Sequence, residues 1–355
     1  MSLQLTQLPP LPTGFRNGAG FSDKDKVYAG LGSLGSKWLR LDTTQPMGWV
    51  ECADFPGVKR TDPVCVPVSD GCYIFSGAGI APGSHSLSVL EDGYFYDANR
   101  DSWNLVTDNI PVGLLGGAGI ELLNKQLVLV GGYNKSVFDT LMQQLSDPLV
   151  CDNEAQKRDC LCTFMDQPIE FYGWNDKIYR FDIETKEWLD IGDNPFEPNC
   201  GAGVWRLGNA LALIEGEVKP GLRSLQSKLL LLNSEGLVDS AELSPIVEQD
   251  PYHEGLAGAY CAELDGLCMM LGGAYFIGSQ SNYRHGKYYS HQGLAKTYAT
   301  KIWQLCGGKW QHVGDLKKGK AYGVCLSISN GIVLIGGEDA SGQALTECEL
   351  ISVIR

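Results

Sequence analysis

The segment GEVKPGLRS (216–224) combines the side chains best suited to acid–base chemistry on an anionic ligand. Glu217 can act as a general base if partial desolvation raises the pKa of its carboxyl group toward neutrality. Six residues later, Arg223 offers a planar fork that suits a carboxylate ligand, and Lys219 adds a second cation. A Pro-Gly pair between them predicts a turn that lets Glu217 and Arg223 approach each other. An ordinary Glu–Arg salt bridge that fixes the loop fits the same spacing, so both interpretations stay open.

The segment GSQSNYRHGKYYSHQGLAKTY (278–298) gathers cationic and titratable side chains among four tyrosines. We interpret it as a cationic, hydroxyl-rich wall for an anionic polyol, with three candidate substrate contacts: Tyr283, Lys287 and His291. A solvated loop or helical segment is the alternative. His285 and His291 lack the i, i+4 spacing of helical metal pairs, so we expect no metal site here.

Both segments belong to an internal repeat. An apolar strand that ends in two glycines recurs as VLVGG (128–132), MMLGG (269–273) and VLIGG (333–337), with weaker copies at 27–32, 74–77 and 212–216. Around each copy the sequence predicts four short strands, the second ending at the glycines and the fourth opening near a tryptophan. This pattern is typical of the Kelch repeat, with roughly 50 residues per β-propeller blade. Six copies therefore predict an all-β, six-bladed Kelch-type β-propeller.

The two ends of the chain complement each other in this pattern. The last copy, from 317 onward, supplies only three strands, and residues 4–12 can provide the fourth. Closing the ring with strands from both termini removes the exposed sheet edge. We therefore expect a single domain over residues 1–355, with blades at approximately 15–56, 57–111, 112–195, 196–246, 247–316 and 317–355 plus 4–12.

Long insertions interrupt the repeat, and all of them follow the glycine position: 79–91, 133–176, 217–227 and 274–299. Loops at that position emerge on one face of a propeller, together with the links between blades. Function often resides in loops held by a rigid scaffold, so this face is the candidate site. We expect a partly helical insertion there. Arg60 and Tyr322 lie in inter-blade links on the same face and are further candidates for substrate contacts.

Composition excludes several classes of protein. The 355 residues include 28 basic and 42 acidic side chains, a net charge of −14 that argues against nucleic-acid binding. No window reaches about 18 uninterrupted apolar residues, so we expect no membrane span. The glycine runs lack the strand–GxGxxG–helix context and the P-loop lysine of a nucleotide site. Cys160 and Cys162 lack the second cysteine pair of a zinc site, so we expect no metal at this position.

The N-terminal segment MSLQLTQLPPLP lacks the basic start and the apolar stretch of a signal peptide. Scattered cysteines in a long chain favour a reducing compartment, and together these features predict a cytoplasmic protein. A periplasmic protein whose leader has been removed is the alternative. A homodimer stays open.

In its motifs the chain resembles the Kelch-type N-acetylneuraminate epimerases, also called sialic acid mutarotases, nearly from end to end. The resemblance rests on VYAGLGS…WLRLDT, GEVKPGLRS, GGAYFIGSQSNYRHGKYYSHQGL and KAYGVCLSISNGIVLIGGEDASGQALT. It implies an isomerase that interconverts the α and β anomers of N-acetylneuraminate, a small anionic sugar, by acid–base ring opening and closure without a cofactor. It also implies that Glu217 is the proton acceptor and that Arg223 is needed for activity.

Other functions stay open beside this resemblance. The segment KRTDPVCVPV and the insertion at 133–176 differ from the usual text of that family, which leaves a mutarotase for a related sugar acid as one alternative. A non-catalytic Kelch protein-interaction module is another, although it has no need of Glu217, Lys219 and Arg223 together. A sialidase would require Ser-x-Asp-x-Gly-x-x-Trp boxes, which are absent, and a Kelch-type copper oxidase would require several histidine ligands from only five histidines.

Overall fold

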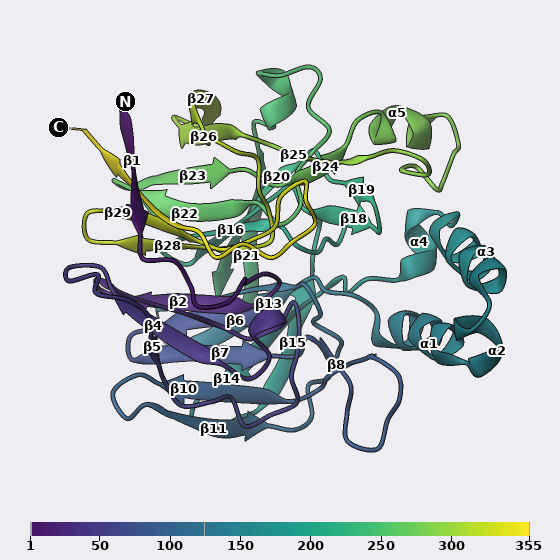
Figure 1. Ribbon diagram of the computed structural model, residues 1–355, viewed down its shortest axis with the longest axis horizontal. Helices are drawn as coiled ribbons and strands as arrows, with labels where there is room; N and C mark the ends of the chain where they lie inside the picture. Colours follow the sequence, from purple (N-terminus) through teal and green to yellow (C-terminus); the bar gives the residue numbers. More distant parts are fainter. Residues whose placement is uncertain (1, 124, 355) are drawn as a thin grey trace.

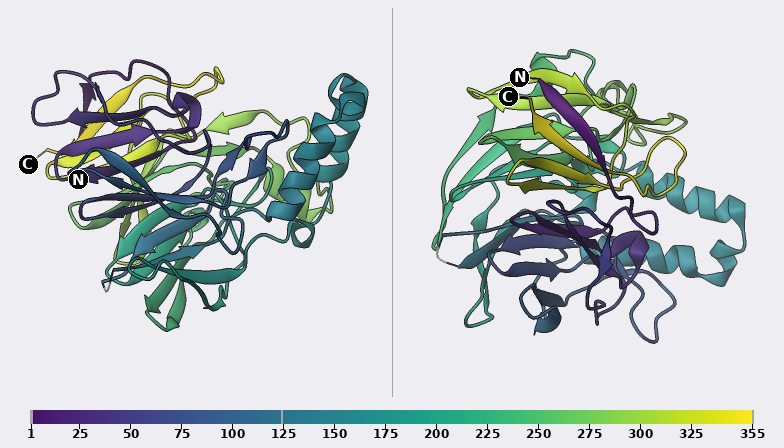
Figure 2. Two further views of the ribbon diagram at one scale, coloured as in Figure 1. Left: turned by 90° about the horizontal axis from the view of Figure 1, so that it is seen from below. Right: turned by 60° about the vertical axis from the view of Figure 1, so that its left-hand side comes forward.

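The computed structural model describes residues 2–123 and 125–354; Met1 and Arg355, the ends of the predicted domain range, lie outside the described residues. Within these ranges, six four-stranded antiparallel sheets are arranged as a propeller (Figures 1 and 2), so the predicted fold class is confirmed. The first three sheets contain β2 (Ala19–Asp23), β3 (Lys26–Gly30), β4 (Trp38–Asp42) and β5 (Val50–Glu51); β6 (Val64–Val68), β7 (Gly71–Phe75), β10 (Gly93–Asp97) and β11 (Ser102–Thr107); and β12 (Ala118–Glu121), β13 (Gln126–Val130), β14 (Lys177–Asp182) and β15 (Trp188–Asp193). The other three contain β16 (Gly203–Leu207), β17 (Ala210–Ile214), β20 (Ser227–Asn233) and β21 (Gly236–Leu243); β22 (Tyr260–Leu264), β23 (Leu267–Leu271), β26 (Lys301–Cys306) and β27 (Lys309–Asp315); and β28 (Val324–Ile328), β29 (Gly331–Ile335), β30 (Cys348–Val353) and β1 (Leu3–Leu8).

The second strand of a blade packs against both neighbouring blades. In β17, Leu211 and Leu213 join a core cluster with blade three, whereas Ala212 and Ile214 join one with blade five. All five residues of β17 are therefore buried, and the same is true of β7 and β29. A strand buried on both faces reads as a continuous apolar run rather than as an alternating pattern. This explains why these strands mark the repeat so clearly in the sequence.

Backbone conformation explains the two glycines that follow these strands. Gly131 and Gly132 have φ of 69° and 103°, in the left-handed region that is costly for residues with a side chain. In the three weaker copies the first position is Leu31, Ser76 or Glu215, and each keeps this conformation, with φ of 62°, 57° and 56°. The copies are therefore structurally equivalent even where the first glycine is missing.

The two termini complete the sixth blade. Strand β1 pairs antiparallel with β30 from Leu3↔Val353 to Leu8↔Cys348, and the chain ends lie side by side in Figure 1. The prediction that strands from both termini close the ring is confirmed. As a result, the blade at the junction of the ends has the same four strands as the others.

The insertions project from one side of the propeller, on the right in Figure 1. Three of them form small hairpins: β8 (Ala78–Gly79) with β9 (Ser88–Val89), β18 (Glu217–Lys219) with β19 (Leu222–Arg223), and β24 (Ala274–Phe276) with β25 (Lys296–Tyr298). The predicted helical insertion is confirmed in α1 (Lys135–Ser146), α2 (Pro148–Cys151), α3 (Glu154–Met165), α4 (Ile169–Tyr172) and α5 (Ser279–Arg284). Two 3₁₀ turns, Gly32–Leu34 and Ile246–Glu248, complete the helical content of the described residues. None of the helices described is long and apolar enough to cross a membrane.

The links between blades form a closed ring of backbone hydrogen bonds, which we call the inter-blade ring. Each link contributes one residue with φ between 50° and 70°, and its N–H donates to the carbonyl oxygen of the equivalent residue in the preceding link, over 2.7–3.0 Å. In ring order these residues are Asn17, Asp62, Gly116, Gly201, Gly258 and Tyr322. Glycine adopts this conformation freely, whereas other residues do so at a cost of about 1–2 kcal/mol, less for Asn and Asp. The three positions that are not glycine therefore call for another explanation.

Candidate active site

A short hairpin in blade four positions the candidate base. The register of β18 and β19 pairs Glu217 with Arg223, and Gly221, with φ of 82°, lies in the turn between them. Arg223 Nη1 donates to Glu217 Oε1 in an ion pair. The Glu217 side chain is 20% exposed and that of Arg223 only 2% exposed. The carboxylate is therefore the member of the pair that is open to a ligand.

Each nitrogen of the Arg223 guanidinium has a partner within the protein. In addition to the bond from Nη1 to Glu217, Nε donates to the carbonyl oxygen of Ala274 (3.0 Å) and Nη2 to the Tyr322 hydroxyl (3.5 Å). The Phe276 ring lies 5.3 Å from the guanidinium carbon. These contacts fix the guanidinium, which in turn orients the Glu217 carboxylate.

Tyr133 contacts the other oxygen of the candidate base. Its hydroxyl donates to Glu217 Oε2 over 3.3 Å. Burial, and then the negative charge of Glu217, hold the pKa of Tyr133 well above its ordinary value, so the phenol remains a donor. Tyr133 was not among the residues predicted from the sequence. The available signal was its position, because it follows the glycines of blade three just as Glu217 follows the glycine of blade four.

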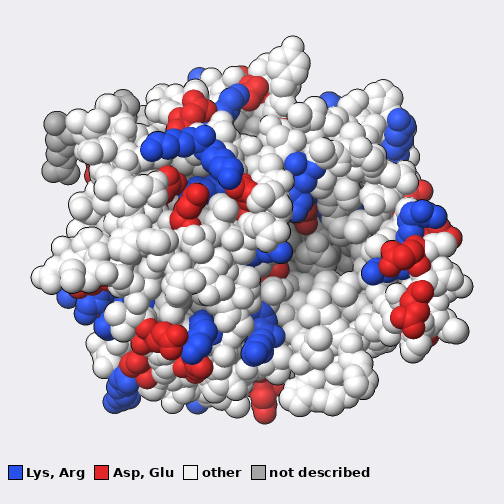
Figure 3. All heavy atoms as spheres, viewed as in Figure 1, with Lys and Arg blue, Asp and Glu red and all other residues white. Residues whose placement is uncertain are grey.

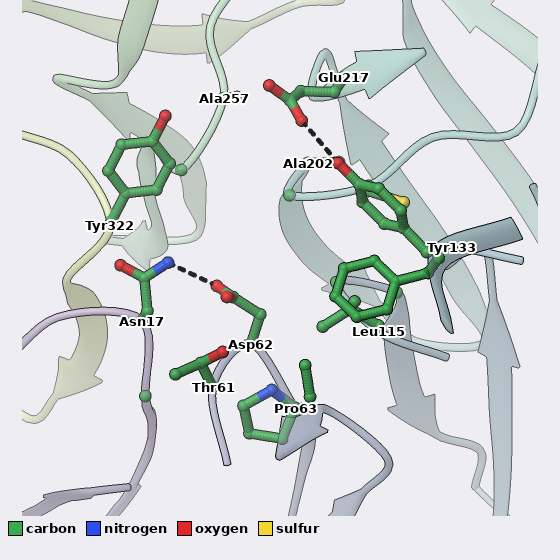
Figure 4. Close-up of a pocket in the computed structure, with 18 of the residues that line it drawn as sticks. Asn17, Thr61, Asp62, Pro63, Leu115, Tyr133, Ala202, Glu217, Ala257 and Tyr322 are labelled. Atoms are coloured by element: carbon green, nitrogen blue, oxygen red, sulfur yellow. Dashed lines mark hydrogen bonds between the residues drawn. The ribbon is translucent and has the colours of Figure 1, made fainter. Parts of the chain in front are cut away.

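A cavity of about 500 Å³ lies in front of Glu217 and is surrounded by the inter-blade ring, all six members of which line it (Figure 4). Its other polar lining residues are Thr61, Tyr133 and Glu217, and its larger apolar ones are Pro63, Leu87, Leu115 and Phe138. The small residues Gly18, Gly117, Ala202, Ala259 and Gly323 also line a second cavity of about 470 Å³. Because the 500 Å³ cavity has both polar and apolar lining residues, it can contact a ligand that carries hydroxyl groups on one side and an apolar group on another.

Asp62, which was not predicted from the sequence, places a second carboxyl group in the cavity. Asn17 Nδ2 donates to Asp62 Oδ1 over 2.8 Å, and both side chains point into the cavity in Figure 4. Burial raises the pKa of Asp62 to about 6, and the negative charge of Glu217 contributes in the same direction. The cavity therefore contains an ion-paired carboxylate and a carboxyl group that holds its proton to a higher pH than usual.

The whole chain is similar to a known family of proteins. A model of the N-acetylneuraminate epimerase family matches residues 8–353. The chain belongs to the N-acetylneuraminate epimerase family. It is an isomerase of the epimerase type, so the predicted resemblance and enzyme class are confirmed.

Individual proteins similar to this chain support the assignment. A Kelch domain-containing protein of Vibrio cholerae is 37% identical to this chain over 98% of both proteins. The N-acetylneuraminate epimerases of Vibrio cholerae and Brucella melitensis are 35% and 33% identical, and the matches cover 95% and 97% of this chain and 88% and 89% of theirs. The solved structure of YjhT has a TM-score of 0.89 at 33% identity and covers 98% of this chain and 97% of its own.

In this epimerase-family protein, two further predicted contacts lie in different surroundings. Tyr322 belongs to the inter-blade ring, lines the cavity and accepts from Arg223. Lys219 is buried and is not among the described residues that line the cavity. Its Nζ donates to the carbonyl oxygens of Met165 (3.0 Å), Gln167 and Tyr288 (2.6 Å). Lys219 therefore ties the helical insertion to the loop after α5.

Arg60, another predicted substrate contact, is also buried and engaged within the protein. Its Nη1 and Nη2 donate to Asp92 Oδ1 and Oδ2 over 2.7 and 3.1 Å. The guanidinium carbon lies 4.8 and 5.5 Å from the ring centroids of Phe55 and Tyr94. The described residues that line the 500 Å³ cavity do not include Arg60. Its contacts are those of a residue that holds the first inter-blade link in place.

Within the predicted wall at 278–298, α5 and the loop after it pack against the β18–β19 hairpin. His291 packs between Phe276 and Tyr289, with ring centroids 4.8 and 4.9 Å away. Burial, followed by the positive charges of nearby basic groups, lowers the pKa of His291 to about 4, so the ring is neutral at physiological pH. The Tyr283 ring lies 5.8 Å from the Lys219 Nζ, and Lys287 is exposed. None of these predicted contacts is among the described residues of the cavity lining.

Two cations lie next to the cavity: Arg16, which was not predicted from the sequence, and Lys296, which belongs to the predicted cationic wall at 278–298. Arg16 and Lys296 line an adjoining hollow that shares Tyr322 with the main cavity, and the Lys296 Nζ lies 5.1 Å from the Tyr322 ring. Both cations pair with Glu338 but are 37% and 41% exposed. Basic side chains flank the hollowed region between the propeller and the helices in Figure 3. These cations can therefore reach an anionic group at the cavity entrance.

Proposed function

We propose that this protein interconverts the α and β anomers of N-acetylneuraminate by acid–base-catalysed ring opening and closure, without a cofactor. The observation that supports it most directly is the Glu217 carboxylate, oriented by Arg223 and Tyr133 at the edge of a cavity of about 500 Å³. Membership of the N-acetylneuraminate epimerase family and the names of its relatives support the choice of sugar.

The chemistry requires little more than correctly placed proton donors and acceptors. N-Acetylneuraminate is a cyclic hemiketal, and opening the ring removes a proton from the anomeric hydroxyl and delivers one to the ring oxygen. Glu217 is the proton acceptor in this proposal, and the Arg223 guanidinium keeps its carboxylate oriented. A positioned base or acid typically contributes about 10²–10⁴-fold to a proton-transfer step, which suffices for a reaction that already proceeds slowly in water. Reclosure on the opposite face of the carbonyl gives the other anomer.

Recognition of the substrate uses both sides of the cavity in this proposal. Because the Arg223 guanidinium is engaged within the protein, the sugar carboxylate pairs with Arg16 and Lys296 at the entrance. The N-acetyl methyl group packs against Leu115 and Phe138 on the apolar side. Burial of one methyl or methylene group contributes about 0.8 kcal/mol. This combination favours an acylated sugar acid over one without the acyl group.

The test follows anomeric exchange by NMR after α-N-acetylneuraminate is released into buffer near neutral pH. The wild-type protein is expected to accelerate exchange, and Glu217→Gln, which keeps the size of the side chain, is expected to lower kcat by about 10²-fold or more. Glu184→Gln, at an exposed turn between β14 and β15, is the matched control and should behave as wild type.

Two results would contradict the proposal in different ways. A wild-type rate equal to that of buffer would reject this substrate, and a sugar acid without the acyl group would then be assayed in the same way. Full activity in Glu217→Gln would retain the substrate but reject Glu217 as the base.

A further inference from the structure

We propose that Asp62 is the general acid that protonates the ring oxygen as the sugar opens and accepts that proton again as the ring closes. This inference rests on the proposed function, because it assigns the proton donor that the reaction requires opposite Glu217. It goes beyond the resemblance to the epimerase family, because that resemblance implies roles for Glu217 and Arg223 but none for Asp62.

The inter-blade ring provides the first argument. Six equivalent positions share a left-handed backbone and line the cavity, and three of them are glycine. The other three, Tyr322, Asn17 and Asp62, are consecutive around the ring. Non-glycine residues in this conformation cluster at functional sites, because the backbone cost is tolerated where the side chain is needed. Their side chains form one continuous polar arc of the cavity wall.

The contacts of Asp62 provide the second argument. Its N–H donates to the Asn17 carbonyl oxygen (2.8 Å), and its own carbonyl oxygen accepts from Gly116 N–H (2.9 Å). Asn17 also binds the carboxyl group through Nδ2. The backbone and one carboxyl oxygen are thus fixed, so the group is preorganised toward the cavity, as an acid catalyst requires.

Electrostatics provides the third argument. The other ionisable groups that line the cavity are Tyr133, Cys200, Glu217 and Tyr322. Burial raises the pKa of Tyr133, Cys200 and Tyr322 above their ordinary values, so they are neutral, and Glu217 is the charged neighbour in the lining. Burial first and Glu217 second raise the pKa of Asp62 to about 6. An entering sugar carboxylate adds negative charge and further favours the protonated form of Asp62. The charged side chains of Arg16, Lys296 and Glu338 line the adjoining hollow and not the main cavity.

Two carboxyl groups, those of Glu217 and Asp62, account for every proton transfer in the reaction, and no other reactant is needed. On opening, Glu217 takes the proton of the anomeric hydroxyl, and the bond between the anomeric carbon and the ring oxygen breaks. The electron pair of that bond stays on the ring oxygen, which takes the proton of Asp62. The products are a carbonyl group and a free hydroxyl group. On closure, that hydroxyl attacks the carbonyl carbon, its proton returns to Asp62, and Glu217 returns its proton to the carbonyl oxygen. Both residues end in their starting states.

Two variants test the role of Asp62 in the NMR exchange assay. Asp62→Asn is nearly isosteric and can still accept from Asn17, whereas Asp62→Gly suits the left-handed backbone and matches three other positions of the ring. We expect kcat/KM to fall about 10²-fold in both. In wild type, kcat/KM should decline as the pH rises above about 6, because the acid loses its proton, and this decline should be absent from both variants. Added acetic acid should partly restore Asp62→Gly, since a merely structural loss would not respond to it.

Several controls separate the possible outcomes. Asp70→Asn, at the exposed turn between β6 and β7, should keep the wild-type rate and pH profile. Asn17→Gly should move the decline to higher pH, because the Asn17 hydrogen bond lowers the pKa of Asp62. If wild type accelerates exchange but both Asp62 variants keep its rate and pH profile, Asp62 is not the acid while the proposed function stands. If wild type does not accelerate exchange, the proposed function fails and this inference fails with it.

Discussion

Substitution of Lys219 can show whether this lysine binds substrate or stabilises the docking of the helical insertion. Its buried ammonium group donates to three carbonyl oxygens: one at the end of α3, one between α3 and α4, and one after α5. Hydrogen bonds from a charged group contribute about 1.5–3 kcal/mol each, and burying an ammonium group offsets several kcal/mol of that gain. Lys219→Met keeps the apolar stem, removes the three bonds and leaves the carbonyl groups buried. We expect a net loss on the order of 3 kcal/mol in the docking of the helical insertion.

The assay is hydrogen exchange measured by mass spectrometry. A loss of this size corresponds to about 10²-fold faster exchange, if the insertion opens as a local unit. The increase should be confined to α4, the segment before it and the loop after α5. Lys157→Met, which removes a 43%-exposed lysine from α3, is the matched control and should leave exchange unchanged. The structural argument would be refuted if Lys219→Met raised KM more than tenfold while exchange in the insertion stayed at the wild-type rate.

Two further predictions concern residues behind the cavity. The folded pKa of His291, about 4, lies below its ordinary 6.5, so the unfolded chain binds the proton first and the free energy of unfolding falls as the pH drops through this window. Urea unfolding of wild type should show a loss of about 2 kcal/mol in unfolding free energy between pH 6.5 and 4.5. This loss should be absent from His291→Phe and retained in His285→Phe. Equal losses in all three proteins would contradict the prediction. Arg60→Met should cost about 3 kcal/mol in unfolding free energy because it leaves Asp92 unpaired, and a second change, Asp92→Leu, should recover most of it. A raised KM at unchanged stability in Arg60→Met would instead identify a substrate contact.

The fold could be predicted from the sequence because each blade repeats the same local pattern. Strands such as GIVLI (331–335) are buried on both faces and therefore stand out as apolar runs. The glycines that follow them occupy left-handed backbone, which few other residues adopt readily. The apolar runs and the glycines both lie within a few neighbouring residues, so a single sequence is enough to recognise them. Even the pairing of the termini followed from counting strands in the last copy.

The candidate site could be predicted only in part. Glu217 and Arg223 lie on two strands joined by one tight turn, so their contact is a short-range property. Lys219 shows where this reasoning fails, because simple alternation along a strand would place residues 217 and 219 on the same face. The hairpin register shifts between these two residues, so Lys219 points instead toward the helical insertion. An irregularity of this kind has no clear signature in the sequence.

What the sequence determined by itself is the repeat, the face on which the insertions gather, and the local pair of Glu217 and Arg223. Tertiary structure alone decided which residues share the cavity, because Asn17, Asp62 and Tyr322 come from links far apart in the chain and meet through ring closure. It also decided protonation, since the raised pKa of Asp62 depends on burial and on the charge of Glu217 across the cavity. Short-range patterns report backbone conformation and burial along one strand, whereas the chemistry of the cavity arises from side chains that only the closed propeller brings together.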